Sequence, residues 1–224
     1  MLNKLSIVCS SQNSFDELKK QTIQSCGLPP NSVEFIGYTN NGEYSLNEIY
    51  NKGLSEAKHP HIVFMHHDIK FNTSNWGRKL LKHFARNPEY GIIGVAGTNN
   101  LLSGKWWEDR LSMHGIVNHS ENGKTWATRF SPDQGNKIKE MVVLDGVFFA
   151  VDKTKIIHHF DEEFKGFHFY DLGFTFPNYL AGVKIGVCTD IRITHMSVGR
   201  VNEMWEKNKQ QFEEKYKQDI PCKL

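Results

Sequence analysis

The sequence predicts a mixed α/β domain whose central sheet is mainly parallel, Rossmann-like and flanked by helices. In the first half of the chain, short apolar runs of strand length alternate with amphipathic segments of helical spacing. Repeated strand–helix–strand units of this kind form parallel sheets with right-handed crossovers. The 224 residues, of which 39% are hydrophobic and 12% aromatic, suit one domain with a substantial core. We find no internal repeat or linker, so we expect a single domain with a smaller mixed region in its second half.

Start signals and apolar runs define the elements expected in the first half. Ser14 with Glu17 and Ser45 with Glu48 each match a capping box, which marks the start of a helix. Asn75 is expected to cap a third helix. The β-rich apolar runs that predict strands are 5–9, 33–38, 61–65 and 91–97.

The second half of the chain is less regular. An aromatic-rich segment is followed by a predicted hairpin around Glu121-Asn122-Gly123, with strands at 113–119 and 125–130. Residues 170–181 have helical spacing, although Pro177 must kink this helix or mark its start. A terminal amphipathic helix is expected at 201–216. Short strands are predicted at 141–144, 147–151, 185–188 and 191–194.

Composition excludes several classes of function. The net charge is +2, from 27 basic and 25 acidic residues, which disfavours nucleic acid as a partner but leaves peripheral association with an anionic membrane open. Neither GxGxxG nor GxxxxGK[ST] is present, which argues against dinucleotide binding and P-loop chemistry. The four cysteines have no CxxC spacing, and no signal peptide or membrane span is recognised. We expect a cytoplasmic protein, with the inner face of the membrane as the alternative place.

One polar cluster follows a buried strand directly. The run 61–65 ends in His66, His67 and Asp68, a carboxylate beside imidazoles that is suited to a divalent cation. Ligands of parallel α/β sheets bind at the carboxyl ends of the strands. Because Ser10, Ser11 and Tyr38 also follow predicted strands, we expect one crevice to collect them with Asp68.

Seven short segments carry a resemblance to a known family over nearly the whole chain. They are Asn51-Lys52-Gly53, Phe64-Met65-His66-His67-Asp68, Gly94-Val95-Ala96-Gly97, Trp106-Trp107, Leu144-Asp145-Gly146, Tyr170-Asp171-Leu172 and Ile193-Thr194-His195. In this order and spacing the chain resembles the GT-A glycosyltransferases, more narrowly family 2 in its bacterial glycosyltransferase-like branch. The resemblance implies a single domain in which residues 1–97 form the nucleotide-sugar-binding half. Residues 98–224 would form the acceptor half with the C-terminal helix.

The resemblance also implies a metal site and a donor site. Asp68 and His195, with His66 in place of the first acid of the family's motif, would hold Mn²⁺ or Mg²⁺. Imidazole ligands make Mn²⁺ the more plausible of the two ions. The nucleoside diphosphate sugar, with a UDP-sugar preferred, would contact the following residues: Ser10, Ser11, Tyr38, Asn51, His67 and Asp68.

The residues implied in catalysis and acceptor binding each have a structural alternative. Asp171 would be the catalytic base that takes a proton from the acceptor hydroxyl, or it caps the following helix. The acceptor would contact Asp145 and Gly146, which otherwise form a bulge or turn. The acceptor side would also include the aromatic residues Trp106, Trp107 and Tyr170, and tandem tryptophans are equally common as core or lid anchors.

The resemblance implies a glycosyltransferase that depends on a metal ion and inverts the configuration at the anomeric carbon. The enzyme would be a hexosyltransferase-like protein of polysaccharide biosynthesis that transfers a sugar to a hydroxyl group of a glycan or glycolipid. One alternative is a non-catalytic module that binds a sugar nucleotide or a glycan on a GT-A fold. The other is a metallohydrolase that activates water at His66, Asp68, Asp171 and His195.

Overall fold

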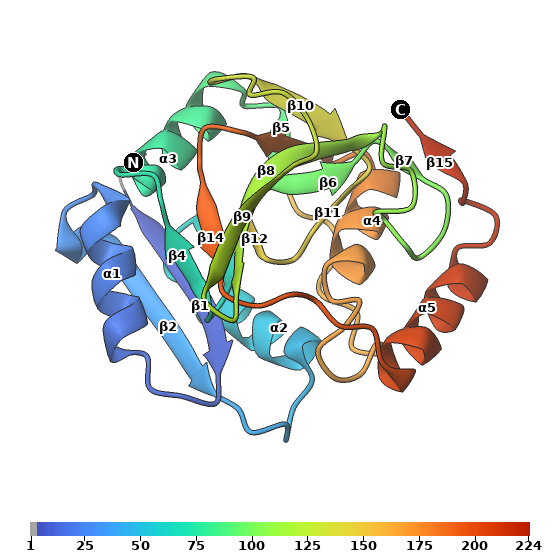
Figure 1. Cartoon of the computed structure of the whole chain (residues 1–224), viewed down its shortest axis with the longest axis horizontal. Coiled ribbons are helices and arrows are strands. Elements are labelled where there is room, and N and C mark those ends of the chain that lie inside the picture. The colour runs from blue at the N-terminus through green and yellow to red at the C-terminus, as the bar shows by residue number, and fades with distance from the viewer. Residues whose placement is uncertain (1–3) are drawn as a thin grey trace.

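The computed structural model describes residues 4–224, and its largest sheet has seven strands (Figure 1). Their order is β10-β13-β5-β12-β3-β1-β2. Their bounds are β1 (Leu5–Ser11), β2 (Val33–Thr39), β3 (His61–His66), β5 (Tyr90–Gly94), β10 (Ile138–Met141), β12 (Phe148–Asp152) and β13 (Lys184–Cys188).

The α/β fold class is confirmed, but this sheet is mixed rather than mainly parallel. β1 pairs in parallel with β2 and β3, and β13 pairs in parallel with β5. β12 runs antiparallel between β3 and β5, and β10 runs antiparallel to β13. β12 can take this central place because residues on both of its faces are apolar and buried, from Phe148 to Val151.

A second sheet has six strands, which alternate along the chain with strands of the first sheet. It has the order β11-β6-β8-β14-β4, and β9 pairs with β8. Their bounds are β4 (Ile69–Phe71), β6 (Ala96–Thr98), β8 (Met113–Glu121), β9 (Lys124–Arg129), β11 (Val143–Leu144) and β14 (Ile193–His195). A short third sheet pairs β7 (Asn100–Leu101) with β15 (Cys222–Lys223).

Two of the expected strands are each divided between the two large sheets. The run 91–97 breaks at Val95 into β5 and β6, and the run 141–144 breaks at Val142 into β10 and β11. Both breaking residues are fully buried, so the apolar pattern continues across the change of sheet. The sequence therefore predicts strand character here, but it does not predict the corner at which the chain passes from one sheet to the other.

Five α-helices are present within residues 4–224, and they cover both faces of the seven-stranded sheet. They are α1 (Asp16–Cys26), α2 (Leu46–Glu56), α3 (Trp76–Arg86), α4 (Leu172–Leu180) and α5 (Glu203–Lys215), with a 3₁₀ helix at Pro30–Ser32. Alternate residues of β3 enter two different core clusters: Val63 packs with side chains of α1 and α3, and Phe64 packs with those of α2 and α4. No helix in this part of the chain has the length and apolar character needed to cross a membrane.

Of the three helix starts predicted from capping residues, only the one at Ser45 has the expected capping contacts. Ser45 and Glu48 form the expected capping box of α2. The box predicted for Ser14 is wrong: α1 begins one residue later, after Phe15, so Glu17 is too close, and the Ser14 hydroxyl accepts from the Asp16 N–H instead. Asn75 does occupy the position before α3, but its backbone is left-handed and its side chain makes no capping hydrogen bond.

Candidate active site

Three strand ends bring His66, Asp68 and His195 together. His66 ends β3 and His195 ends β14, which pairs antiparallel with β4 so that His195 lies opposite Ile69, the residue after Asp68. The Asp68 Oδ1 lies 3.3 Å from His195 Nε2 and 3.8 Å from His66 Nδ1, and the two ring nitrogens are 3.1 Å apart. Two imidazole nitrogens and a carboxylate oxygen within 4.8 Å of one another can hold one divalent cation. His67 is exposed and lies outside this group.

The charge states of this group suit a metal. Burial alone would raise the pKa of Asp68, but hydrogen bonds from His195 and Ser197 and the nearby imidazoles hold that pKa well below its usual range. Burial of the ring, followed by the charge of His195, lowers the pKa of His66 to about 4. At neutral pH Asp68 is therefore a carboxylate and His66 is a neutral ring, one nitrogen of which carries a lone pair.

Tyr170 lies next to His66 and is largely buried. Its hydroxyl is 2.5 Å from His66 Nε2, and only 4% of the residue is exposed. The same hydroxyl packs against Gly146, where an added Cβ would overlap it. Tyr170 thus connects the third strand to the turn between β11 and β12.

The two carboxyl groups expected at the site are held by backbone N–H groups. Asp171 caps α4: its Oδ1 accepts from Leu172 N at 2.9 Å, and its Oδ2 accepts from Gly146 N at 3.0 Å. Asp145 Oδ1 accepts from Val147 N at 2.9 Å, which forms a tight turn at Gly146. Burial and then the charge of Asp145 raise the pKa of Asp171 to about 7, and burial also raises the pKa of Asp145.

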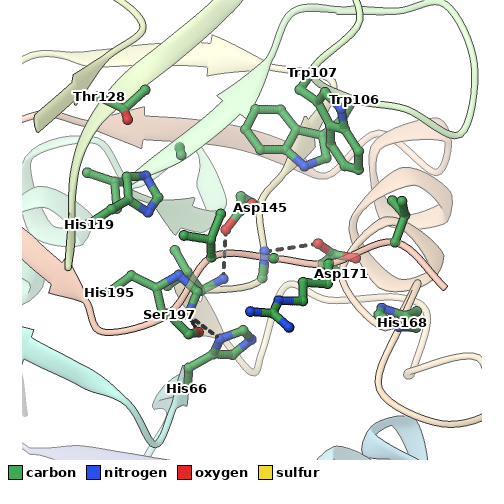
Figure 2. Close-up of a pocket in the computed structure, with 18 of the residues that line it drawn as sticks. His66, Trp106, Trp107, His119, Thr128, Asp145, His168, Asp171, His195 and Ser197 are labelled. Carbon is green, nitrogen blue, oxygen red and sulfur yellow. Dashed lines mark hydrogen bonds between the residues drawn. The ribbon is translucent and has the colours of Figure 1, made fainter. Parts of the chain in front are cut away.

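A single cavity of about 950 Å³ collects most of the residues that the sequence singled out (Figure 2). Its floor contains members of the metal group and both carboxyl groups, and its walls come from the β8–β9 hairpin and the segment after β14. The residues expected at the site that line this cavity are His66, Trp106, Trp107, Asp145, Gly146, Tyr170, Asp171 and His195.

The two tryptophans differ in exposure. Trp106 is 6% exposed and packs edge-on against Phe130, at 5.9 Å between ring centroids. Trp107 is 37% exposed and stands edge-on to Trp106 and tilted against Trp205. Trp106 therefore anchors the cavity wall, and Trp107 is a partly exposed residue of the cavity lining.

The residues expected to contact the nucleotide do not line this cavity. Ser10 pairs with His66 across β1 and β3, so it lies beside the metal group. Ser11 accepts from Asn13 N, and the Tyr38 hydroxyl donates to Glu56. The amide of Asn51 binds the backbone of Phe160, which ties α2 to the loop before α4.

The structure adds His119 to the site, which sequence reasoning missed. His119 on β8 is paired with His195 on β14, at 6.1 Å between ring centroids, and it stacks on Trp126. Its Nδ1 is buried and has no hydrogen-bond partner among the described residues. A histidine inside a predicted hairpin strand was the available signal, but the pairing of β8 with β14 was not foreseeable.

A family model described as "Glycosyltransferase like family" matches residues 5–220. The chain belongs to this family. The structure of this glycosyltransferase-like protein is similar to the crystal structure of GalNAc-T7 with UDP, GalNAc and Mn²⁺, with a TM-score of 0.56 and 12% identity over 94% of this chain and 47% of that chain. The glycosyltransferase-like chain thus spans about half the length of that chain, and the likeness confirms a GT-A fold.

A second solved structure and the curated proteins add no further assignment. A197 from STIV has a TM-score of 0.49 and 9% identity over 87% of this chain and 86% of that chain. No curated protein sequence matches the glycosyltransferase-like chain.

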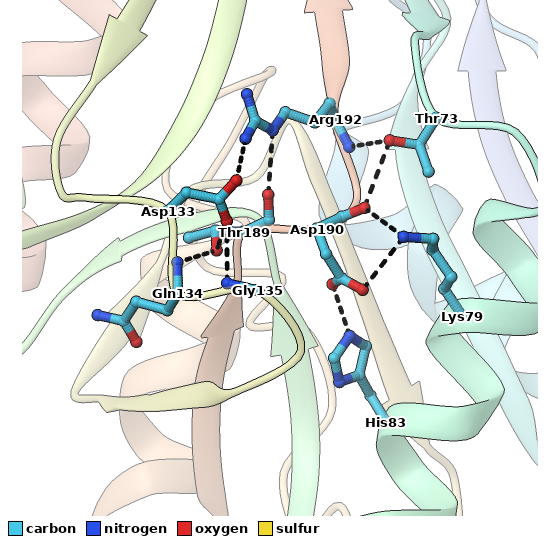
Figure 3. A network of polar contacts seen from close by, with 9 residues as sticks. All are labelled: Thr73, Lys79, His83, Asp133, Gln134, Gly135, Thr189, Asp190 and Arg192. Atoms are coloured by element: carbon cyan, nitrogen blue, oxygen red, sulfur yellow. Dashed lines mark hydrogen bonds and ion pairs between the residues drawn. The ribbon is translucent and has the colours of Figure 1, made fainter.

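A second polar group joins α3 to the chain before β14 (Figure 3). The Asp190 carboxylate binds His83 Nε2 at 2.7 Å and Lys79 Nζ at 3.4 Å, and the Thr73 hydroxyl accepts from Arg192 N at 2.8 Å. The buried thiol of Cys188 lies close to His83 and Asp190. Because Lys79 and His83 already satisfy Asp190, we interpret this group as a structural tie that positions β14, and hence His195.

Proposed function

We propose that this protein is a divalent-cation-dependent glycosyltransferase that moves a hexosyl group from a nucleoside diphosphate sugar to a hydroxyl group of a glycan or glycolipid. The observation that carries the proposal is that Asp171 lines the same cavity as His66 and His195. The family and the GT-A fold support the same reaction class.

The donor atoms of His66, Asp68 and His195 fit a cation such as Mn²⁺. A set of two nitrogen ligands and one oxygen ligand would leave coordination positions on the cation for phosphate oxygens and water. When bound, the cation would stabilise the negative charge that develops on the leaving diphosphate. The Tyr170 hydroxyl next to His66 Nε2 orients the ring so that Nδ1 faces Asp68 and His195.

In this proposal Asp171 acts as the base of an inverting transfer. Its carboxylate takes the proton of the acceptor hydroxyl as that oxygen attacks the anomeric carbon. The bond from the anomeric carbon to the diphosphate oxygen breaks, and its electron pair leaves with the diphosphate. The hydrogen bonds from Leu172 N and Gly146 N hold the carboxylate in one orientation throughout.

We propose UDP as the nucleotide and the carboxyl ends of β1 and β2 as its binding place. The fold of GalNAc-T7, which was crystallised with UDP and Mn²⁺, supports this choice. Ser10, beside His66, would lie nearest the diphosphate, with Ser11 and Tyr38 farther along the strand ends. The exposed ring of Trp107 would stack on a sugar of the acceptor.

Asp171→Asn tests the catalytic assignment. We expect transfer from UDP-sugars, measured as UDP release with a mixture of glycan acceptors, to fall by about 10²–10⁴-fold. Binding of UDP with Mn²⁺, measured by titration calorimetry, should persist in the variant. Wild-type binding of UDP without any turnover would identify a non-catalytic module instead, and phosphoester hydrolysis that needs no acceptor would identify a metallohydrolase.

A further inference from the structure

The strand register aligns one residue of each strand in a row that crosses the site. In the first sheet, Tyr38 on β2 is opposite Ser10 on β1, and Ser10 is opposite His66 on β3. The chain continues from His66 into β4, whose first residue is opposite His195 on β14, and His195 is opposite His119 on β8. Figure 2 shows His66, His195 and His119 in this order along one wall. The proposed cation site therefore lies in the middle of the row.

A nucleoside diphosphate sugar can extend along this row. Its nucleoside and its sugar are attached to opposite ends of the diphosphate. With the nucleoside at the ends of β1 and β2 and the diphosphate beside His66, the sugar lies toward β14 and β8, which are neighbouring strands about 4.8 Å apart. We propose that His119 binds a hydroxyl group of the transferred hexose; this inference rests on the function proposed above.

The side chain of His119 is on the face of β8 that lines the cavity. Val117 and Glu121, two residues to either side, also line the cavity, whereas the residues between them do not. This alternation is the one expected of a strand with one face toward a ligand. Thr128 on β9 is opposite Val117 and belongs to the same lining, so the hairpin presents a second hydroxyl-binding group beside His119.

The packing of His119 leaves its ring available to a ligand. Trp126 stacks on the ring at 5.7 Å between centroids and restrains its orientation. Its Nδ1 is buried and has no hydrogen-bond partner among residues 4–224, although a buried imidazole with a purely structural role normally has one. Because Nδ1 is enclosed, Nε2 is the nitrogen that a ligand in the cavity can reach. A hydroxyl group can donate to or accept from this nitrogen, so it matches either tautomer.

Asp145 and the Gly146 turn lie across from His119 in the cavity. Burial raises the pKa of Asp145, and the charges of His195 and His119 act in the opposite direction because both rings lie near its carboxyl group. The same turn orients Asp171, whose carboxylate accepts from Gly146 N. A hexose held at His119 therefore lies next to the proposed catalytic base, where its anomeric carbon must be for transfer.

The test separates the hexose from the nucleotide. Binding is measured by titration calorimetry in saturating Mn²⁺ for UDP, UDP-glucose, UDP-galactose, UDP-N-acetylglucosamine and UDP-N-acetylgalactosamine. His119→Phe keeps an aromatic ring against Trp126 but removes both nitrogens. We expect this variant to bind the best of the UDP-hexoses about ten-fold more weakly and to bind UDP unchanged. His119→Gln keeps a polar group at the distance of Nε2 and should retain most of the affinity for that UDP-hexose.

The matched control is His114→Phe, a partly buried histidine on the same strand that does not line the cavity, and it should affect neither ligand. The inference is overturned by unchanged binding of every UDP-hexose in His119→Phe, by an equal loss for UDP and UDP-hexose, or by an equal loss in the control. A wild type that binds neither UDP nor any UDP-hexose contradicts the proposed function as well. UDP binding that persists while hexose binding is indifferent to His119 contradicts only this inference.

Discussion

Asp171 uses its two carboxylate oxygens for two structural contacts, one to the first N–H of α4 and one to Gly146. The catalytic and the helix-capping interpretations of this residue are therefore compatible. A helix N-terminus normally stabilises a carboxylate. Here burial and the neighbouring Asp145 outweigh that effect and raise the pKa of Asp171 to about 7. Such a value suits a group that must take a proton near neutral pH.

The rate of transfer should depend on the ionisation of Asp171. Because a carboxyl group with a raised pKa stays protonated up to that higher pH, the base is inactive below pH 7 and becomes available above it. We expect kcat to rise about ten-fold per pH unit below a limiting pKa near 7 and to level off above it. A rate that stays level down to pH 5 would contradict the assignment of Asp171 as the base.

Gly146 is required where Tyr170 passes over the turn. In Gly146→Ala the new methyl group would overlap the Tyr170 hydroxyl, so either the ring or the turn must move. We expect a loss of about 1–3 kcal/mol in the free energy of unfolding, as for an overpacked core, together with loss of transfer. Gly199→Ala is the control for stability, because an added Cβ at Gly199 meets no atom within 4 Å. Equal unfolding midpoints in the two variants would contradict this prediction.

At the scale of elements, the position of β14 depends on contacts made before the strand begins. Asp190 binds α3 through His83 and Lys79, and Arg192 pairs with Asp133 (Figure 3). β14 then pairs with β4 and β8, which places His195 beside Asp68 and His119. The tie to α3 therefore supports one ligand of the proposed metal site from a distance.

Asp190→Asn should weaken this tie. The variant keeps the shape of the side chain but removes the charge that His83 and Lys79 share, so we expect the free energy of unfolding to fall by roughly 1–3 kcal/mol. Thermal unfolding measures this change. Asp219→Asn is the matched control, since Asp219 is exposed and its side chain forms no hydrogen bond or ion pair within residues 4–224. An Asp190 variant as stable as the control would show that the network contributes nothing.

At the scale of the whole molecule, residues far apart in the chain meet at one cavity. His66 comes from the first sheet, His195 from the second, and Asp171 from the start of α4 (Figure 2). The β8–β9 hairpin and the segment after β14 enclose them. Because one group of residues would serve both the cation and the diphosphate, binding of the two should be coupled.

His195→Ala should uncouple Mn²⁺ from UDP. In the wild type, a ligand at about 100 times its dissociation constant adds about 2.7 kcal/mol to the free energy of unfolding, and we expect Mn²⁺ to increase the stabilisation by UDP. The His195→Ala variant should lose the part of the stabilisation by UDP that depends on Mn²⁺. His159→Ala, an exposed histidine elsewhere on the surface, should keep it. Full retention in His195→Ala would show that the cation binds at another place.

Local patterns in the sequence determined the strand character of the apolar runs, the capping box at Ser45 and the polar cluster that ends β3. Such features depend on residues a few positions apart, so they can be recognised without the fold. The family resemblance also rested on short segments, and the match to residues 5–220 confirms it.

Only the tertiary structure decided which strands are neighbours. The insertion of β12 between β3 and β5, the corner at Val95 and the pairing of His119 with His195 all join segments distant in sequence. A period of two predicts which faces of a strand are buried, but it does not identify the partner strand. The physical reason is that these pairings follow from how two apolar sheets and five helices share one core, a property of the whole chain.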